Sequence, residues 1–177
     1  MSVTALTGTR EFSIEALRAG RPDALAALYR EHGAALYRLA YRLTGSRHDA
    51  EDVVHDMFVG LPEALRRYEE RGELAAWLKR VAARVALMRL RSRKRRREVG
   101  LDAAEPRTDP SSGTDGIALQ TAVDALPDRL RVVLVLKEIE GYSHAEIGDL
   151  LGISAVASRV RLNRALRRLR KALEDGR

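Results

Sequence analysis

The side chains with the clearest chemical potential in this 177-residue chain are cations, and they are concentrated in two segments. Residues 159–171 contain seven Lys or Arg residues and no acid, and residues 79–97 contain ten and no acid. Guanidinium groups bind phosphate oxygens and can form paired hydrogen bonds with the edge of guanine. Both segments therefore predict contact with nucleic acid. In the first segment, the candidates for base contacts are Arg159, Arg161, Asn163 and Arg164.

Each basic segment also has a purely structural explanation. A row of cations can be the solvated face of a helical bundle, although the ten cations of residues 79–97 repel one another unless an anion binds them. Trp77 precedes this segment, and an aromatic ring beside cations suits the stacking of unpaired bases. The same residue keeps helical spacing with Leu74, Leu78 and Val81, so a place in the hydrophobic core is an equal alternative.

An acidic cluster stands out against this basic background. Residues 49–56 contain four carboxylates, several of which share one face of a helix. DNA phosphates would repel such a face, whereas a basic protein surface would be attracted to it. Part of the negative charge is also explained by the stabilising effect of acids at a helix N-terminus. The cluster therefore predicts a protein-docking surface in addition to a local structural role.

Histidine and aspartate residues in the same stretch raise the alternative of a metal-dependent phosphohydrolase. His48 and Asp52 are one helical turn apart, and two His-Asp pairs occur here. Such a site needs further ligands that are distant in sequence, and only His32 and His144 remain as histidines. The chain contains no cysteine, no nucleotide-binding glycine loop and no nucleophile elbow. We therefore expect no metal, no cofactor and no catalytic residue.

The spacing of apolar residues predicts helices around all of these side chains. The helices predicted in the N-terminal half span residues 25–43, 49–65 and 74–97. Gly45 fits the end of the first helix and Asp49 the cap of the second, and Pro62 predicts a kink or break within the second. Because no segment shows a clear strand pattern, the predicted fold class is all-α.

The C-terminal half has the pattern of a helix-turn-helix. Ser143 and Glu146 form a capping-box pattern at the start of a short helix. A turn at Gly152 separates this helix from a long one, which Ser154 caps and which extends to Leu173. In a motif of this kind the basic second helix enters the major groove of DNA, and the first helix supports it.

Composition divides the helices into two units. Residues 99–121 are rich in Gly, Pro, Ser and Asp and lack apolar periodicity, so they predict a flexible, acidic linker. The expected domains are a helical unit at 22–98 and a helix-turn-helix unit at 122–177, after an N-terminal extension at 1–21.

The overall composition narrows the class of protein. A net charge of +7 suggests a polyanionic partner, and 45% hydrophobic residues suffice for a core. The absence of cysteine excludes disulfides and thiolate metal sites. The N-terminus lacks the pattern of a secretory signal, and the longest aliphatic run, at 132–136, is too short to span a bilayer. The expected location is the cytoplasm.

The order of these features resembles a group 4, or extracytoplasmic-function, sigma factor of bacterial RNA polymerase. The N-terminal unit is similar to sigma region 2 and the C-terminal unit to sigma region 4. The segments that carry the resemblance to region 2 are LYREHG (28–33), YRLA (37–40), DAEDVV (49–54), AWLKRVA (76–82) and the basic run that follows. Those that carry the resemblance to region 4 are LP (126–127), EGYS (140–143), EI (146–147), LGIS (151–154) and RA (164–165).

The resemblance implies a promoter-specificity subunit that binds core RNA polymerase and helps to melt promoter DNA, without an active site of its own. Region 2 would dock on the clamp helices of the largest polymerase subunit, and region 4 would contact the flap. The implied polymerase-docking residues are Asp49, Glu51, Asp52, Val53, Asp56, Met57 and Phe58. An anti-sigma factor is a common partner in this family, so we expect one here.

The resemblance also divides promoter recognition between the units. The helix from Leu74 would bind the −10 element, beside a turn at 68–72 that would capture a flipped base. The implied −10 residues are Tyr68, Arg71, Trp77, Lys79, Arg80, Arg84, Met88 and Arg91. The final helix would read the −35 element in the major groove. The implied −35 residues are Ser154, Ala155, Ser158, Arg159, Arg161, Leu162, Asn163, Arg164, Arg167 and Arg168.

Some positions depart from the family pattern. Arg84 and Met88 stand where Asn and Asp are usual in the −10-reading helix. Ser158 stands where a buried Val is usual, and Val160 where a small polar residue is usual. A buried, unpaired hydroxyl costs roughly 1–3 kcal/mol, so either Ser158 bonds back to a carbonyl or the helix is shifted or loosely packed. A free-standing helix-turn-helix regulator that does not bind polymerase remains the main alternative.

Overall fold

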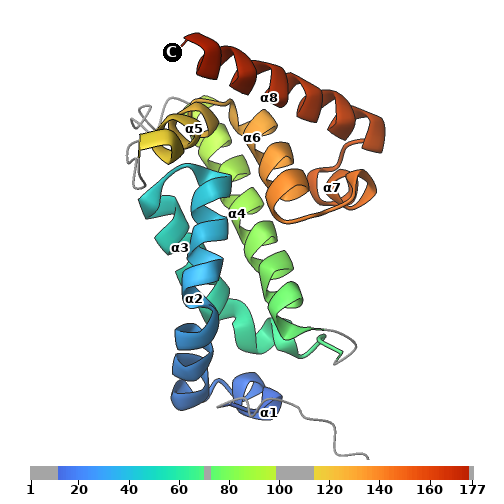
Figure 1. Cartoon of the computed structure of the whole chain (residues 1–177). Coiled ribbons are helices and arrows are strands. Elements are labelled where there is room, and N and C mark those ends of the chain that lie inside the picture. The colour runs from blue at the N-terminus through green and yellow to red at the C-terminus, as the bar shows by residue number, and fades with distance from the viewer. Residues whose placement is uncertain (1–11, 70–72, 99–113, 176–177) are drawn as a thin grey trace, which may run out of the picture.

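The computed structural model describes residues 12–69, 73–98 and 114–175. Within these ranges every regular element is helical, which confirms the all-α fold class (Figure 1). Arg71 and linker residues 99–113 lie outside the described residues. None of the described helices is long and apolar enough to cross a membrane.

The N-terminal unit is a helical bundle. Its helices are α1 (Ile14–Arg18), α2 (Pro22–Thr44), α3 (Arg47–Leu65) and α4 (Leu74–Glu98). The three longer helices pack against one another, and α1 lies against α2 and α3. Their apolar faces meet in a core in which Leu28, Leu61 and Leu78 are fully buried. The helical periodicity read from the sequence therefore corresponds to real buried faces.

Local signals set the boundary between α2 and α3. α2 ends at Gly45, which adopts a left-handed φ of 67° that favours glycine. The prediction that Asp49 caps α3 is wrong, because Ser46 is the capping residue. Ser46 has extended backbone geometry, and its hydroxyl accepts a hydrogen bond from the backbone N–H of Asp49 at 3.2 Å.

Pro62 predicted a kink or a break, and the break is absent, because α3 continues through Pro62 to Leu65. Proline lacks an N–H group and so removes one hydrogen bond from the helix. Leu61 and Leu65 flank it and are both fully buried. Their burial in the core holds this last turn in helical geometry.

The C-terminal unit contains the helix-turn-helix. Its elements are α5 (Thr114–Asp124), α6 (Asp128–Leu134), a π-helical turn η1 (Val135–Ile139), α7 (His144–Leu151) and α8 (Ala155–Asp175). The predicted capping box is present, since Ser143 N–H donates to Glu146 Oε2 at 2.8 Å and Glu146 N–H donates to Ser143 Oγ at 3.2 Å. Residues 114–121 of the expected linker belong to α5, which packs against α8.

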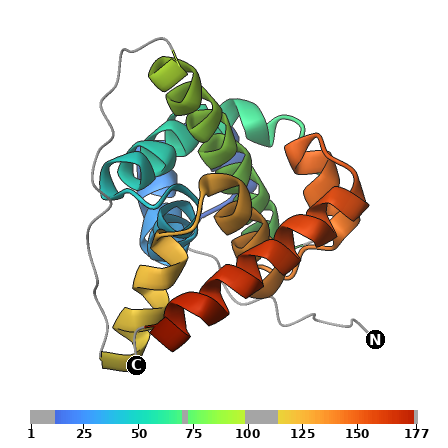
Figure 2. The ribbon, with the colours of Figure 1, turned by 90° about the horizontal axis from the view of Figure 1, so that it is seen from above.

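The two units are in contact. α6 packs against both α8 and α2, and Figure 2 shows it between α8 and the N-terminal helices. Buried residues of both units form one continuous hydrophobic cluster. Figure 1 shows α8 running across one end of the bundle formed by α2, α3 and α4. This arrangement decides which of the candidate site residues face outward.

Candidate nucleic-acid and protein interfaces

Two glycines allow the helices of the helix-turn-helix to approach each other. Gly152 ends α7 with a left-handed φ of 66°. At Gly148, an added Cβ atom would lie 2.6 Å from the carbonyl oxygen of Ile153, so the close approach of the turn requires glycine. Gly152 is identifiable from its place after a helix. Gly148 lies inside a helix, and only the tertiary structure reveals its role.

Ser158 is fully buried, and its hydroxyl has a partner that the sequence did not suggest. The Oγ atom lies 2.9 Å from Nδ1 of His144, across the interface between α7 and α8. Partial desolvation, followed by the nearby charges of Lys137 and Arg159, lowers the pKa of His144 from its ordinary value. The polar residue at this core position is therefore satisfied by a side chain of the supporting helix.

One side of α8 is buried and the opposite side is free for contact. Ser158, Leu162 and Leu169 are buried against the other helices, so Ser158 and Leu162 support the helix and do not face outward. The exposed −35 candidates are Ser154, Arg159, Asn163, Arg164, Arg167 and Arg168, and the partly buried ones are Ala155 and Arg161. Ser154 also caps α8, since it accepts a hydrogen bond from Ala157 N–H at 3.0 Å.

A basic groove of about 480 Å³ lies between α6 and the C-terminal half of α8. Its lining includes Arg164, Arg167 and Arg168, together with Arg129 and Lys171, which were not among the sequence candidates. No acidic residue lines it. A groove of this composition suits a row of phosphates. Arg129 comes from α6, so only the packing of α6 on α8 brings it to the other cations.

The −10 candidates on α4 fall into two groups. Arg80, Arg84 and Met88 are exposed, and 57% of the surface of Met88 is accessible. In contrast, Lys79 and Arg91 contact the C-terminal unit. Lys79 forms an ion pair with Glu140 at 2.9 Å, and Arg91 Nη2 donates to the carbonyl oxygen of Leu150 at 3.1 Å.

The aromatic −10 candidates lie in or near the core. Tyr68 is buried, and its ring packs at a tilt against that of Trp77, with 4.9 Å between centroids. Trp77 is half-buried. Core packing, one of the two explanations open for Trp77, accounts for most of its surface in this conformation.

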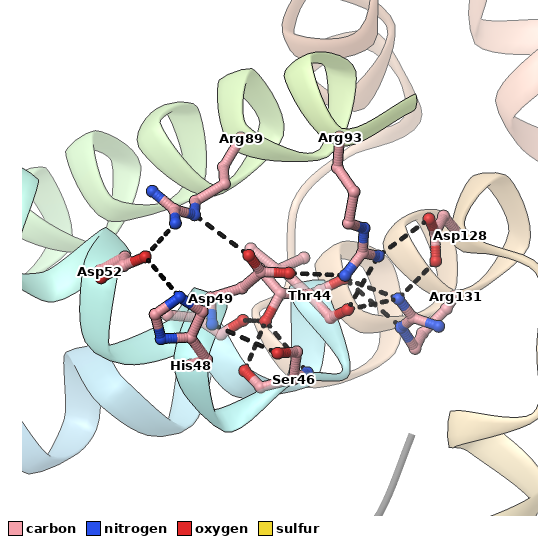
Figure 3. Close-up of polar contacts among 11 residues, drawn as sticks. Thr44, Ser46, His48, Asp49, Asp52, Arg89, Arg93, Asp128 and Arg131 are labelled. Carbon is pink, nitrogen blue, oxygen red and sulfur yellow. Dashed lines mark hydrogen bonds and ion pairs between the residues drawn. The ribbon is translucent and has the colours of Figure 1, made fainter. Parts of the chain in front are cut away.

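The acidic cluster of α3 is paired with cations of α4 (Figure 3). Asp49 is buried and contacts Arg89 at 3.1 Å and Arg93 at 2.5 Å. Arg89 also pairs with Asp52 and, at 3.7 Å, with Asp56. The sequence showed the carboxylates and the cations separately, but the pairing of positions about forty residues apart depends on the packing of α3 on α4.

The remaining docking candidates differ in accessibility. Glu51 and Asp56 are exposed on α3, whereas Val53 and Met57 are buried. Phe58 is half-buried and packs edge-on against Tyr29. A groove of about 500 Å³ between α3 and α4 is lined by Asp56, by apolar side chains that include Met88, and by Arg89, Ser92 and Arg96. Asp56 thus lies at a partly apolar groove that also carries cations, whereas Glu51 is not among its lining residues.

The histidines near this cluster do not form a metal site. His48 Nε2 lies 3.4 Å from an oxygen of Asp52. Across residues 12–69, 73–98 and 114–175, no group of three His, Cys, Asp or Glu side chains could hold a metal ion. The described geometry therefore gives no support to the phosphohydrolase alternative.

Comparisons with known families and proteins agree with this architecture. Residues 28–96 match the family model for sigma-70 region 2, and residues 116–169 match that for sigma-70 region 4. The extracytoplasmic-function sigma factor SigE of Mycolicibacterium smegmatis is 35% identical over 94% of this chain and 68% of its own length. SigW of Bacillus subtilis, of the same kind, is 29% identical over 92% of this chain and 95% of its own length.

Solved structures show the same fold. The sigma factor RpoE of Bartonella quintana, in complex with the anti-sigma factor NepR, matches with a TM-score of 0.63 and 24% identity, over 84% of this chain and 96% of its own. CnrH, in complex with the cytosolic domain of CnrY, matches with a TM-score of 0.57 and 27% identity, over 92% of this chain and 95% of its own.

Proposed function

The chain belongs to the extracytoplasmic-function group of sigma-70 factors, and from this premise we propose how its surfaces divide the work of starting transcription. A protein of this family is the promoter-specificity subunit of bacterial RNA polymerase. Region 2 corresponds to α2–α4 and region 4 to α5–α8. Since polymerase carries out RNA synthesis, we assign no catalytic residue to this chain and place its action in the cytoplasm.

Region 4 reads the −35 element with the outer side of α8. Arg159 and Asn163 lie near the N-terminal part of this helix, where a recognition helix meets base edges. The basic groove farther along α8 binds phosphates and fixes the register of the helix on the duplex. Leu162 and Ser158 contribute indirectly, because they position α8 from the buried side.

Region 2 binds the −10 element with the exposed side of α4. Arg80 and Arg84 supply cations for the backbone of an unpaired strand, and Met88 supplies an apolar contact beside them. Arg84 and Met88 replace the Asn and Asp that are usual in the family. We therefore propose that this chain favours a −10 sequence different from that of relatives with the usual residues.

Polymerase docks on the exposed carboxylates of α3. Glu51 and Asp56 are exposed on α3, where a basic partner helix can pair with them. Asp56 also lines the groove between α3 and α4, in which the partner can bury apolar surface. The partner there is the clamp-helix coiled coil, and the flap contacts region 4. The solved neighbour RpoE is in complex with the anti-sigma factor NepR, and CnrH is in complex with the cytosolic domain of CnrY. We propose that an anti-sigma factor also regulates this chain.

The observation that carries this proposal is that two helices with exposed cations belong to two separate units of one chain. An experiment that tests it compares promoter binding by the free chain with binding by the chain and core polymerase together. We expect specific binding only when polymerase is present. Tight, sequence-specific binding to duplex DNA by the free chain, with no effect of polymerase, would instead identify a free-standing regulator.

A further inference from the structure

We propose that region 4 closes onto region 2 through an arginine latch, formed by Asp49, Arg93, Asp128 and Arg131, which holds the free protein in a self-inhibited conformation. The contact between the two regions is observed directly in the structure. Its inhibitory effect rests on the proposed function, because it concerns α4, the helix assigned there to the −10 element.

The centre of the latch is Arg131 of α6, whose side chain is completely buried. Its guanidinium donates to the carbonyl oxygen of Thr44 at 3.0 Å and to that of Leu43 at 3.2 and 3.3 Å. These carbonyls end α2, where a helix leaves its last oxygens unpaired and carries partial negative charge. A side chain of region 4 thus caps a helix of region 2.

Arg93 of α4 extends this contact across the boundary between the units. It pairs with Asp49 of α3 at 2.5 Å and with Asp128 of α6 at 3.2 Å, and it donates to the carbonyl oxygen of Thr44 at 3.3 Å. Asp128 in turn pairs with Arg131 at 2.7 Å. Figure 3 shows the resulting chain of alternating charges from α3 through α4 to α6.

The local geometry fits Arg131 closely. A Cβ atom added at Gly45 would lie 3.2 Å from the guanidinium carbon of Arg131, so the end of α2 has no side chain where the guanidinium lies. A buried charge is tolerated only while its partners are in place, and removing one of them is strongly destabilising. The closed arrangement therefore requires these bonds, because closure without them would leave a buried, unpaired guanidinium.

Closure also occupies two cations of α4 that the family resemblance assigns to the −10 element. Lys79 and Arg91 of the −10-binding helix contact Glu140 and the carbonyl oxygen of Leu150 in region 4. In the closed conformation, region 4 competes with DNA for cations of α4, so promoter binding requires the latch to open.

The test measures the separation of the two units in the free, full-length protein. The chain has no cysteine, so spin labels can be placed uniquely at Ala26→Cys in α2 and Arg170→Cys in α8, both exposed. Arg131→Met in this background removes the guanidinium while keeping a long side chain. Arg129→Met is the matched control, because it makes the same chemical change at an exposed position on the same helix.

We expect one narrow distance distribution for the unmodified latch and for Arg129→Met, and longer, broader distances for Arg131→Met. Because Arg131 also bonds to the carbonyl of Leu126 within its own unit, its loss can weaken folding there. The double variant Asp128→Asn/Glu140→Gln removes cross-unit partners and keeps Arg131, and we expect it to shift the distances in the same direction. Distances unchanged in both variants, or already broad with the intact latch, would overturn the proposal.

A second measurement separates the latch from the proposed function. If closure is inhibitory, the opened double variant binds single-stranded DNA about three- to tenfold more tightly than the parent protein, because the state with a free α4 is no longer rare. Opening without tighter binding would overturn the inhibitory role. If neither form binds polymerase in any condition, while the distances still respond to the variants, the closed contact stands and the proposed function fails.

Discussion

The bond between His144 and Ser158 is a polar contact inside a motif that must hold its second helix at a fixed angle. His144 is half-buried, so water can pair with its ring nitrogen when the Ser158 hydroxyl is removed. Ser158 is fully buried, so its hydroxyl has no access to water when the His144 ring is removed. We therefore expect His144→Ala to lower the free energy of unfolding by about 1–3 kcal/mol and Ser158→Ala by only about 0.5–1.5 kcal/mol. Denaturant titration of both variants measures the difference. Equal losses would show that the serine hydroxyl finds another hydrogen-bond partner.

The same histidine predicts a dependence of stability on pH. Its pKa is lowered in the folded protein, so around and below its ordinary value of 6.5 the unfolded chain binds more protons than the folded one. The stability linked to this group is complete above that pH and is lost as the pH falls toward the folded pKa. We expect the unfolding free energy of the protein to fall more steeply with acidification than that of His144→Gln. Parallel pH profiles would contradict this linkage.

At the scale of the element, α8 combines a buried stripe with an outer side rich in cations. Arg159 lies in its N-terminal part and Arg170 near its end, and both are exposed. If Arg159 reads a base, Arg159→Ala weakens the preference of the polymerase complex for its −35 sequence by about 1–3 kcal/mol. Arg170→Ala removes the same charge and serves as the control. Binding measured across −35 variants tests this, and an equal, uniform loss in both proteins would assign Arg159 to phosphate contact alone.

Most elements of the fold were predictable because their ends carry local signals. Gly45, the capping box at Ser143 and the turn at Gly152 each act within a few residues, and each is where the sequence placed it. The cap of α3 was misassigned because Ser46 and Asp49 are both good caps, and backbone geometry selects the serine. α5 was missed as a helix over 114–121 because its composition favours a loop, and its packing against α8 is a tertiary effect.

The candidate site was only partly predictable for the same reason. The types and spacing of cations on α4 and α8 were visible in the sequence, but their pairing was not. Lys79 and Arg93 meet acids of region 4 through contacts that span more than thirty residues. Periodicity reports which side of a helix is apolar, whereas ion pairs between distant segments follow only from the way the helices pack.

At the scale of the whole molecule, the acidic side of α3 has an inner part, Asp49 and Asp52, that α4 holds, and an exposed part, Glu51 and Asp56, of which Asp56 also lies 3.7 Å from Arg89. We expect Glu51→Lys/Asp56→Lys to weaken binding to core polymerase by about tenfold or more, because two attractive contacts become repulsive. Glu15→Lys/Glu31→Lys makes the same charge change at exposed positions on α1 and α2 and is the control. Equilibrium binding of labelled protein to core polymerase measures both, and equal affinities for the two double variants would contradict docking on α3.

The most direct test of the account is transcription with purified components. Core polymerase, the full-length chain and a library of DNA fragments from the source genome are combined, and transcript starts are mapped. The account predicts discrete start sites that require the chain, preceded by shared sequences near positions −10 and −35. Transcripts with the same starts in the presence and absence of the chain, or none in its presence, would contradict the claim that it directs polymerase to promoters.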